Sequence, residues 1–182
     1  APILHQVEPV FTSIAAAIAR YEPVLIACHD EAVRAQVAAR LRAAGIAEAR
    51  LRLFVSPAND TWARDHGPIT VLCRDEPTLL DFGFNGWGGK YAHDLDNLIT
   101  HRLHTQGAFG DAPLETVDLI LEGGSIEVDG QGTLLTTTRC LLAPTRNPGR
   151  TRAQIEAELA ALLGITRFLW LEHGYLAGDD TD

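Results

Sequence analysis

Methionine is absent from this sequence, and cysteine and aromatic residues are scarce. The 182 residues include three cysteines, and aromatic residues make up 7% of the chain. Three widely spaced cysteines give no disulfide framework, so we expect reduced thiols in a cytoplasmic protein. Because no initiator methionine is present and the last residues form an acidic loop, we expect the sequence to be an internal piece of a longer protein.

Basic residues and long hydrophobic runs are also lacking. Fifteen Lys and Arg residues stand against 24 Asp and Glu residues, for a net charge of −9. Without a basic tract, this balance argues against nucleic acid as a partner. No apolar run approaches the ~20 residues that span a bilayer, and no signal-peptide pattern opens the chain, so we expect no membrane partner. The remainder is 46% apolar and 21% charged, which is typical of one globular domain.

The hydrophobic pattern alternates between helices and short strands, which predicts an α/β protein. Helices are expected at residues 10–21, between Asp30 and Gly45, at 94–103 and at 151–163. Strands are expected at residues 24–28, 51–55, 69–73, 79–82, 126–128, 133–136 and 168–171. Turns are expected at Asp75-Glu76-Pro77 and at Asp129-Gly130. In the first helix, Phe11, Ile14, Ala15 and Ile18 share one face, which we expect to pack inward.

Two helical segments resemble one another. Residues 34–41 read RAQVAARL and residues 152–159 read RAQIEAEL, and each is followed by a glycine, a strand and an acidic loop. The second loop, GDDTD, contains Asp180. A repeat of this kind predicts equivalent units whose loops meet around one site. Alternatively, two alanine-rich amphipathic helices are alike by chance.

Residues 59–68, NDTWARDHGP, are dense in polar and aromatic side chains. A carboxylate such as Asp65 accepts paired hydrogen bonds from a planar cation, and the indole of Trp62 offers the cation a π face. This pattern is therefore a candidate site for a planar cation. The alternative is a structural turn in which Asp60 caps a helix, Asp65 pairs with an arginine and Trp62 packs.

Two glycine-rich segments are further candidates. Residues 82–91, FGFNGWGGKY, contain Trp87 among glycines that let backbone approach a ligand, or they form a surface loop pinned by its aromatic residues. Glu122 precedes Gly123 and Gly124. Its carboxylate is suited to accept the ring N–H of a general-base histidine, or it is an exposed side chain at a glycine bend.

Histidine and cysteine provide weaker candidates. His101 and His104 are three residues apart on a predicted helix, which suits either a zinc site or a solvated helix face. Cys28, Cys73 and Cys140 lie in or beside apolar strands, and no histidine is arranged to activate them. We therefore expect three buried structural thiols and no metal site.

Five segments in this order, NDTWARDHGP, FGFNGWGGKY, LEGGSIEVDGQGTLLTT, CLLAPTRNPG and GDDTD, resemble the agmatine deiminase family. That family includes bacterial peptidyl-arginine deiminase relatives and belongs to the guanidino-group-modifying superfamily. The resemblance covers essentially the whole chain. It implies a pentein-type α/β propeller of ββαβ repeats. Residues 1–182 would be a single partial domain of two to three repeats, about half of the propeller.

The implied reaction is hydrolysis of agmatine to N-carbamoylputrescine and ammonia, a step of putrescine biosynthesis, without metal or organic cofactor. By resemblance, Asp65 holds the guanidinium and Glu122 orients the catalytic histidine. Trp62 and Trp87 line the substrate pocket, and Asp180 faces the substrate amine.

In the family, the catalytic histidine and the cysteine nucleophile follow the GDDTD segment. The 182 residues alone are therefore expected to be inactive, with unpaired strand edges that favour a homo-oligomer or a complex with the lost portion. The alternatives are a deiminase acting on arginine in peptides and a non-catalytic guanidinium-binding fragment.

Overall fold

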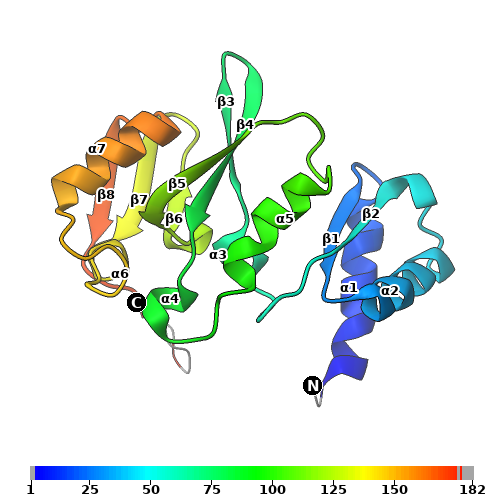
Figure 1. Cartoon of the computed structure of the whole chain (residues 1–182). Helices are drawn as coiled ribbons and strands as arrows, with labels where there is room; N and C mark the ends of the chain where they lie inside the picture. The colour runs from blue at the N-terminus through cyan, green and yellow to red at the C-terminus, as the bar shows by residue number, and fades with distance from the viewer. Residues whose placement is uncertain (1–2, 176, 178–182) are drawn as a thin grey trace. The chain divides into compact units, whose positions relative to one another are not determined.

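The computed structural model describes residues 3–175 and 177 and shows a mixed α/β chain (Figure 1). The α/β class predicted from the alternating pattern is therefore confirmed. The described chain divides into two compact units. Unit 1 comprises Ala1–Ala58 and His101–Asp111, and unit 2 comprises Asn59–Thr100 and Ala112–Asp182.

None of the described helices is both long enough and apolar enough to cross a membrane.

Unit 1 is built on two parallel strands joined by a helix. β1 (Val24–Cys28) pairs in parallel with β2 (Leu51–Val55), and α2 (Glu31–Ala43) connects them. The Asp30 carboxylate accepts a hydrogen bond from the backbone N–H of Val33 at 2.8 Å, which confirms the predicted start of the helix. Both strands have the predicted bounds.

Helix α1 (Leu4–Ile18) departs from the expectation in its start and in its packing. It begins six residues earlier than predicted. Of the face predicted to pack inward, Ala15 is buried, whereas Phe11, Ile14 and Ile18 are exposed. The apolar spacing identified a helical face but not what covers it. Among the described residues of unit 1, Ala15, Val24, Leu41 and Ile46 form a packed cluster of buried apolar side chains.

Unit 2 contains two three-stranded sheets with the same topology. The first sheet is β3 (Ile69–Cys73), β4 (Glu76–Gly83) and β5 (Leu114–Ile120), and the second is β6 (Ile126–Val128), β7 (Thr133–Thr137) and β8 (Arg167–Leu171). In each sheet the first two strands are antiparallel and the last two are parallel. No strand was predicted from the sequence for the residues of β5.

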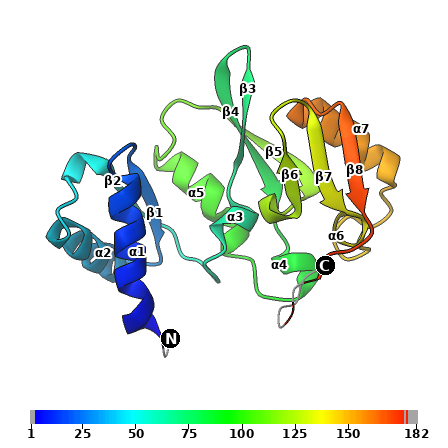
Figure 2. The ribbon, with the colours of Figure 1, turned by 180° about the vertical axis from the view of Figure 1, so that it is seen from behind.

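The two similar helical segments occupy equivalent places in this topology. α2 connects the parallel strands β1 and β2, and α7 (Arg152–Leu163) connects the parallel strands β7 and β8. In both views of unit 2, α7 lies alongside β7 and β8 (Figure 2). Both segments therefore form the helix of a parallel strand–helix–strand arrangement.

The two hairpin turns of unit 2 differ in how well they were predicted. Asp129 accepts backbone hydrogen bonds from Gln131 and Thr133, and the predicted turn there is confirmed. The β3–β4 turn instead consists of Arg74 and Asp75, which have φ angles of 56° and 68°. Two positive φ angles are the geometry of a tight two-residue hairpin, so β4 begins one residue after Asp75 and the predicted Asp-Glu-Pro turn is wrong.

The large core of unit 2 is formed by both sheets and by α7. The capping box of Thr151 and Gln154 starts α7, and left-handed Gly164 ends it, so the helix matches the predicted range 151–163 to within one residue. Ile155 and Leu159 on this helix are fully buried. The buried core residues are Leu80, Phe82, Val117, Leu119, Leu121, Ile126, Leu134, Leu141, Ile155, Leu159 and Ile165.

Short helices and helical turns lie between the strands along the chain. They are η1 (Glu48–Arg50), α3 (Ala63–His66), α4 (Gly86–Gly89), η2 (Asp96–Leu98), α5 (Ile99–Thr105), η3 (Gly123–Ser125) and α6 (Thr138–Leu141). η2 and α5 replace the single helix predicted at 94–103. α4, η3 and α6 each follow the carboxyl end of a strand, and α4 and α6 lie at the same end of unit 2 in Figures 1 and 2. Side chains on these turns form the candidate site.

Candidate guanidinium site

Asp65 joins three of the segments that the sequence singled out. It lies on α3, and its Oδ1 accepts a hydrogen bond from the backbone N–H of Gly124 at 3.1 Å. Its Oδ2 accepts a hydrogen bond from the indole Nε1–H of Trp87 at 3.2 Å. A carboxylate has about four lone-pair sites, so two neutral donors leave capacity for further donors. A guanidinium supplies such donors in a planar fork.

Gly123 and Gly124 allow α3 to approach this closely. A Cβ added to Gly124 would lie 2.3 Å from Oδ1 of Asp65, and one added to Gly123 would lie 2.3 Å from the carbonyl oxygen of Arg64. Neither position has room for a side chain. The glycine pair after Glu122 therefore has a steric cause, namely contact with α3.

Trp87 is held in a left-handed backbone conformation. Its φ and ψ are 57° and 48°, a region that costs a non-glycine residue about 1–3 kcal/mol. The indole packs edge-on against Phe84 at 5.0 Å and near Tyr91 at 5.7 Å between ring centroids. These contacts hold the ring where its N–H reaches Asp65. The FGFNGWGGKY segment is thus pinned by its aromatic residues and also contributes directly to the site.

Glu122 is buried and charge-paired, so the alternative of an exposed side chain at a glycine bend is wrong. Its side chain is 2% exposed, and Oε1 accepts a hydrogen bond from Nε of Arg146 at 2.8 Å. Oε2 lies 3.8 Å from the thiol of Cys140. Arg146 lies in the CLLAPTRNPG segment but was not singled out. A buried carboxylate needs a partner, and the sequence alone does not show which cation is near.

The segment before α3 is anchored through the buried Asp96 carboxylate. Oδ1 of Asp96 accepts a hydrogen bond from the backbone N–H of Asn59 at 2.7 Å, and Oδ2 accepts one from that of Asp60 at 3.2 Å. In addition, the side-chain oxygen of Asn59 accepts a hydrogen bond from the backbone N–H of Leu95 at 2.8 Å. These bonds fix the chain on which Trp62 and Asp65 are carried.

His66 follows Asp65 and is buried, with neither ring nitrogen hydrogen-bonded within the described chain. Its ring lies 5.8 Å from that of Phe84. Burial lowers the pKa of the imidazole, although the nearby Asp96 carboxylate opposes this shift. His66 is therefore maintained as a neutral packing residue beside the acidic site.

Trp62 is not part of the hydrogen-bonded cluster that the described residues form around Asp65. Trp62 is 57% exposed at the start of α3, so the alternative in which its ring packs is wrong. Asp180 lies outside the described residues. Among residues 3–175 and 177, no group of three or more His, Cys, Asp or Glu residues is placed to hold a metal ion.

The three cysteines are free thiols with different surroundings. Cys28 and Cys140 are buried as expected. Cys73 is exposed because it ends β3 beside the hairpin turn, so the expectation of a buried thiol there is wrong.

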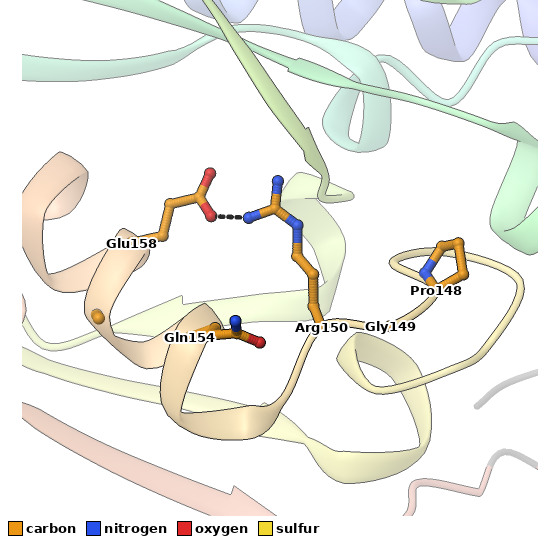
Figure 3. Close-up of a pocket in the computed structure, with 6 residues that line it drawn as sticks. Pro148, Gly149, Arg150, Gln154 and Glu158 are labelled. Atoms are coloured by element: carbon orange, nitrogen blue, oxygen red, sulfur yellow. Dashed lines mark hydrogen bonds and ion pairs between the residues drawn. The ribbon is translucent and has the colours of Figure 1, made fainter.

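A surface hollow lies elsewhere in unit 2, at the start of α7 (Figure 3). Its only cationic lining residue, Arg150, forms an ion pair with Glu158. Because the Arg150 guanidinium already pairs with the Glu158 carboxylate, the residues that line the hollow offer no unpaired carboxylate to a cationic ligand. The hollow is lined by Pro148, Gly149, Arg150, Gln154, Ala157 and Glu158.

The family model of the Porphyromonas-type peptidyl-arginine deiminases matches residues 1–182. The chain belongs to this family. The chain is also similar to agmatine deiminases, as the five ordered segments predict. The chain is 40% identical over 179 residues to the agmatine deiminase of Stutzerimonas stutzeri (strain A1501), covering 94% of this chain and 46% of that protein. It is 36% identical over 190 residues to the agmatine deiminase of Medicago truncatula, and the match covers 95% of this chain and 47% of that protein.

Solved structures of agmatine and peptidyl-arginine deiminases have the same fold as this chain. A substrate-bound variant of C. jejuni agmatine deiminase superposes with a TM-score of 0.86 at 32% identity, covering 100% of this chain and 51% of that chain. The chain thus spans about half the length of the relatives that it matches.

Proposed function

We propose that this chain forms the guanidinium-holding part of an agmatine deiminase. The observation that carries the proposal is the Asp65 carboxylate, which is half-buried and held by two neutral donors, with acceptor capacity left for a cation. The relatives named agmatine deiminases support agmatine as the substrate. A guanidinium keeps its charge at neutral pH because its pKa is near 13, so a binding carboxylate is required.

The proposed reaction is R–NH–C(NH₂)₂⁺ + H₂O → R–NH–CO–NH₂ + NH₄⁺. A cysteine thiolate attacks the guanidinium carbon, and a histidine gives a proton to the departing ammonia. The same histidine then takes a proton from the water that breaks the C–S bond. We place this cysteine and this histidine beyond residue 182, in the length that the relatives have and this chain does not span.

Each site residue has a proposed role in this reaction. Asp65 binds the guanidinium nitrogens, and Glu122 orients the histidine. The exposed indole of Trp62 forms a wall of the substrate pocket, and Trp87 lines the pocket beside Asp65. Asp180 faces the substrate amine. No metal or organic cofactor takes part in the proposed chemistry.

We also propose that residues 1–182 are consecutive ββαβ units of one pentein-type propeller. The matching topology of the two sheets in unit 2, and of the strand–helix–strand order in unit 1, supports this proposal. An open propeller leaves unpaired strand edges, so the chain alone would dimerise or associate with the rest of the protein. The free thiols suit a cytoplasmic enzyme, where deimination of agmatine would supply putrescine biosynthesis.

The second candidate is a deiminase acting on arginine in peptides, which the description of the matching family favours. The two candidates differ in the group beyond the guanidinium, a free amine in one and a peptide in the other.

Turnover separates these candidates. The complete protein is incubated with agmatine or with an arginine-containing peptide, and the product is measured by mass spectrometry. We expect N-carbamoylputrescine from agmatine, little citrulline in the peptide, and no turnover by the 182-residue chain alone. Conversion of the peptide alone would favour the second candidate. Cys140-dependent turnover by the 182-residue chain would contradict the placement of the nucleophile beyond it.

A further inference from the structure

Arg146 and Glu122 form a deeply buried ion pair in unit 2. Nε of Arg146 donates to Oε1 of Glu122 at 2.8 Å, and the two side chains are 4% and 2% exposed. Burying two charges carries a desolvation penalty that can exceed their attraction, so stability alone does not explain such a pair. The Arg150–Glu158 pair in Figure 3 is also an arginine–glutamate pair. Its side chains are much more exposed, at 32% for Arg150 and 26% for Glu158.

The residues on both sides of Arg146 are attached to the site as well. The Thr145 carbonyl accepts a hydrogen bond from the Asn85 side chain at 2.8 Å, in the loop that carries Trp87. The Asn147 side chain donates to the Ile120 carbonyl at 2.9 Å and accepts from its N–H at 3.0 Å, at the end of β5. Residues 145–147 therefore connect the segment of Trp87 with the segment of Glu122.

Glu122 in turn determines where η3 begins. Its carbonyl accepts hydrogen bonds from the backbone N–H of Ser125 at 2.9 Å and from the Ser125 hydroxyl at 2.7 Å. The N–H of Gly124, inside this turn, donates to Asp65. A displacement of Glu122 would therefore move a donor of Asp65.

We propose that Arg146 is a positioning residue that fixes the Glu122 carboxylate and, through η3, the Gly124 donor of Asp65. Arg146 acts through Glu122 and does not contact the substrate. Its Nε donates to Oε1 of Glu122, and Oε2 of Glu122 lies 3.8 Å from the Cys140 thiol. The positioning itself rests on the contacts above, whereas its effect on turnover rests on the proposed function.

The first experiment tests positioning without any substrate. Hydrogen exchange of the Gly124 amide and of the Trp87 indole N–H is measured by NMR in the 182-residue chain and in three variants. In Arg146→Gln, we expect both to exchange at least about tenfold faster, because the donor geometry at Asp65 is lost. Arg146→Lys keeps the charge, and we expect an acceleration of about threefold. Arg150→Gln removes the exposed pair and should leave both rates within about twofold of wild type.

Amides of β7 serve as the reference for global unfolding. If they accelerate as much as Gly124, Arg146 only stabilises the fold and the positioning role is wrong. Equal effects of Arg146→Lys and Arg150→Gln would also contradict it. If Arg146→Gln does not fold, the comparison of the Lys variant with Arg150→Gln decides the question.

The second experiment measures agmatine turnover by the complete protein carrying the same variants. For Arg146→Gln we expect kcat per folded active site to fall about 10- to 100-fold while KM changes less than about threefold, with partial recovery in Arg146→Lys. An unchanged kcat per folded site would contradict a role in turnover. If wild type does not convert agmatine, the proposed function is wrong, and the exchange experiment still decides whether Arg146 positions the site.

Discussion

The two compact units have packed clusters of buried apolar residues that differ in size. Among the described residues, the apolar cluster of unit 1 has four buried members, one of them an alanine, whereas that of unit 2 has eleven, including fully buried Leu134, Leu141, Ile155 and Leu159. The strained Trp87 and the buried Glu122–Arg146 pair both lie in unit 2. Strained residues and buried charges persist only where the surrounding structure holds them firmly. The comparison teaches that the candidate site lies where the fold is best able to support it.

Unit 1 has the opposite character. Its helix α1 exposes Phe11, Ile14 and Ile18, and its sheet has two strands. Its polar contacts include exposed ion pairs, such as Arg42 with Glu48. Exposed pairs of this kind contribute about 0–1 kcal/mol. We therefore expect unit 1 to respond weakly to substitutions that would be severe in unit 2.

The largest expected effect concerns carboxylates in the two units. Asp65→Asn in the complete protein removes the charge that holds the guanidinium, and we expect kcat/KM for agmatine to fall about 10²- to 10³-fold. Asp30→Asn makes the same chemical change in unit 1, where asparagine caps a helix about as well, and should leave kcat/KM within about twofold. Steady-state kinetics measure both. Equal losses in the two variants would remove the functional distinction between the units.

The next effect concerns stability. Leu159→Ala leaves a cavity in the core of unit 2 and should lower the free energy of unfolding by about 2–5 kcal/mol. Phe11→Ala truncates a side chain that is 59% exposed, and should cost less than about 0.5 kcal/mol. Urea denaturation followed by circular dichroism measures both. A larger loss from Phe11→Ala would mean that α1 is packed against something in solution.

A smaller effect tests whether the units unfold separately. All three tryptophans lie in unit 2, so their fluorescence reports on that unit. Thr151→Ala removes the cap of α7 and Asp30→Ala removes that of α2, each at a cost of about 1 kcal/mol. We expect Thr151→Ala to move the fluorescence midpoint in urea and Asp30→Ala to move only the circular dichroism transition. A fluorescence midpoint that shifts equally in both variants would show one cooperative unit.

The smallest effect is a pH dependence in unit 2. Because burial lowers the pKa of His66 in the folded state, the unfolded state takes up its proton first as pH falls below about 6.5. The stability of unit 2 should therefore decline from that pH down to the lower folded pKa. His66→Leu should make this decline in the free energy of unfolding shallower. The free energy is measured by fluorescence-monitored unfolding and compared with its value at pH 8, where the imidazole is neutral in both states. An unchanged slope would show that His66 does not contribute.

Local chemistry predicted much of the fold. The helix starts at Asp30 and Thr151 and the turn at Asp129 were predicted correctly because each depends on a few neighbouring residues. The turn at Arg74–Asp75 was misplaced because neither residue is a glycine, although both have positive φ angles. The exposed face of α1 was also missed, because periodicity identifies an apolar face without showing its partner.

Asp65 and Trp87, two of the residues singled out in the sequence, are hydrogen-bonded to each other, but the sequence did not indicate that contact. Asp65, Trp87 and Glu122 follow from the ordered segments that resemble the family. The indole and backbone donors of Asp65 come from residues 22 and 59 positions away along the chain, and Arg146 lies 24 positions from Glu122. Nothing in a single sequence indicates which distant segments meet, so Arg146 emerged only from the structure.

The most direct test of this account is a crystal structure of the complete protein with agmatine bound. We expect guanidinium nitrogens within about 3.2 Å of the Asp65 carboxylate oxygens, beside the indole of Trp62. A guanidinium bound away from Asp65, with the Asp65 carboxylate contacting only Gly124 and Trp87, would contradict the central claim.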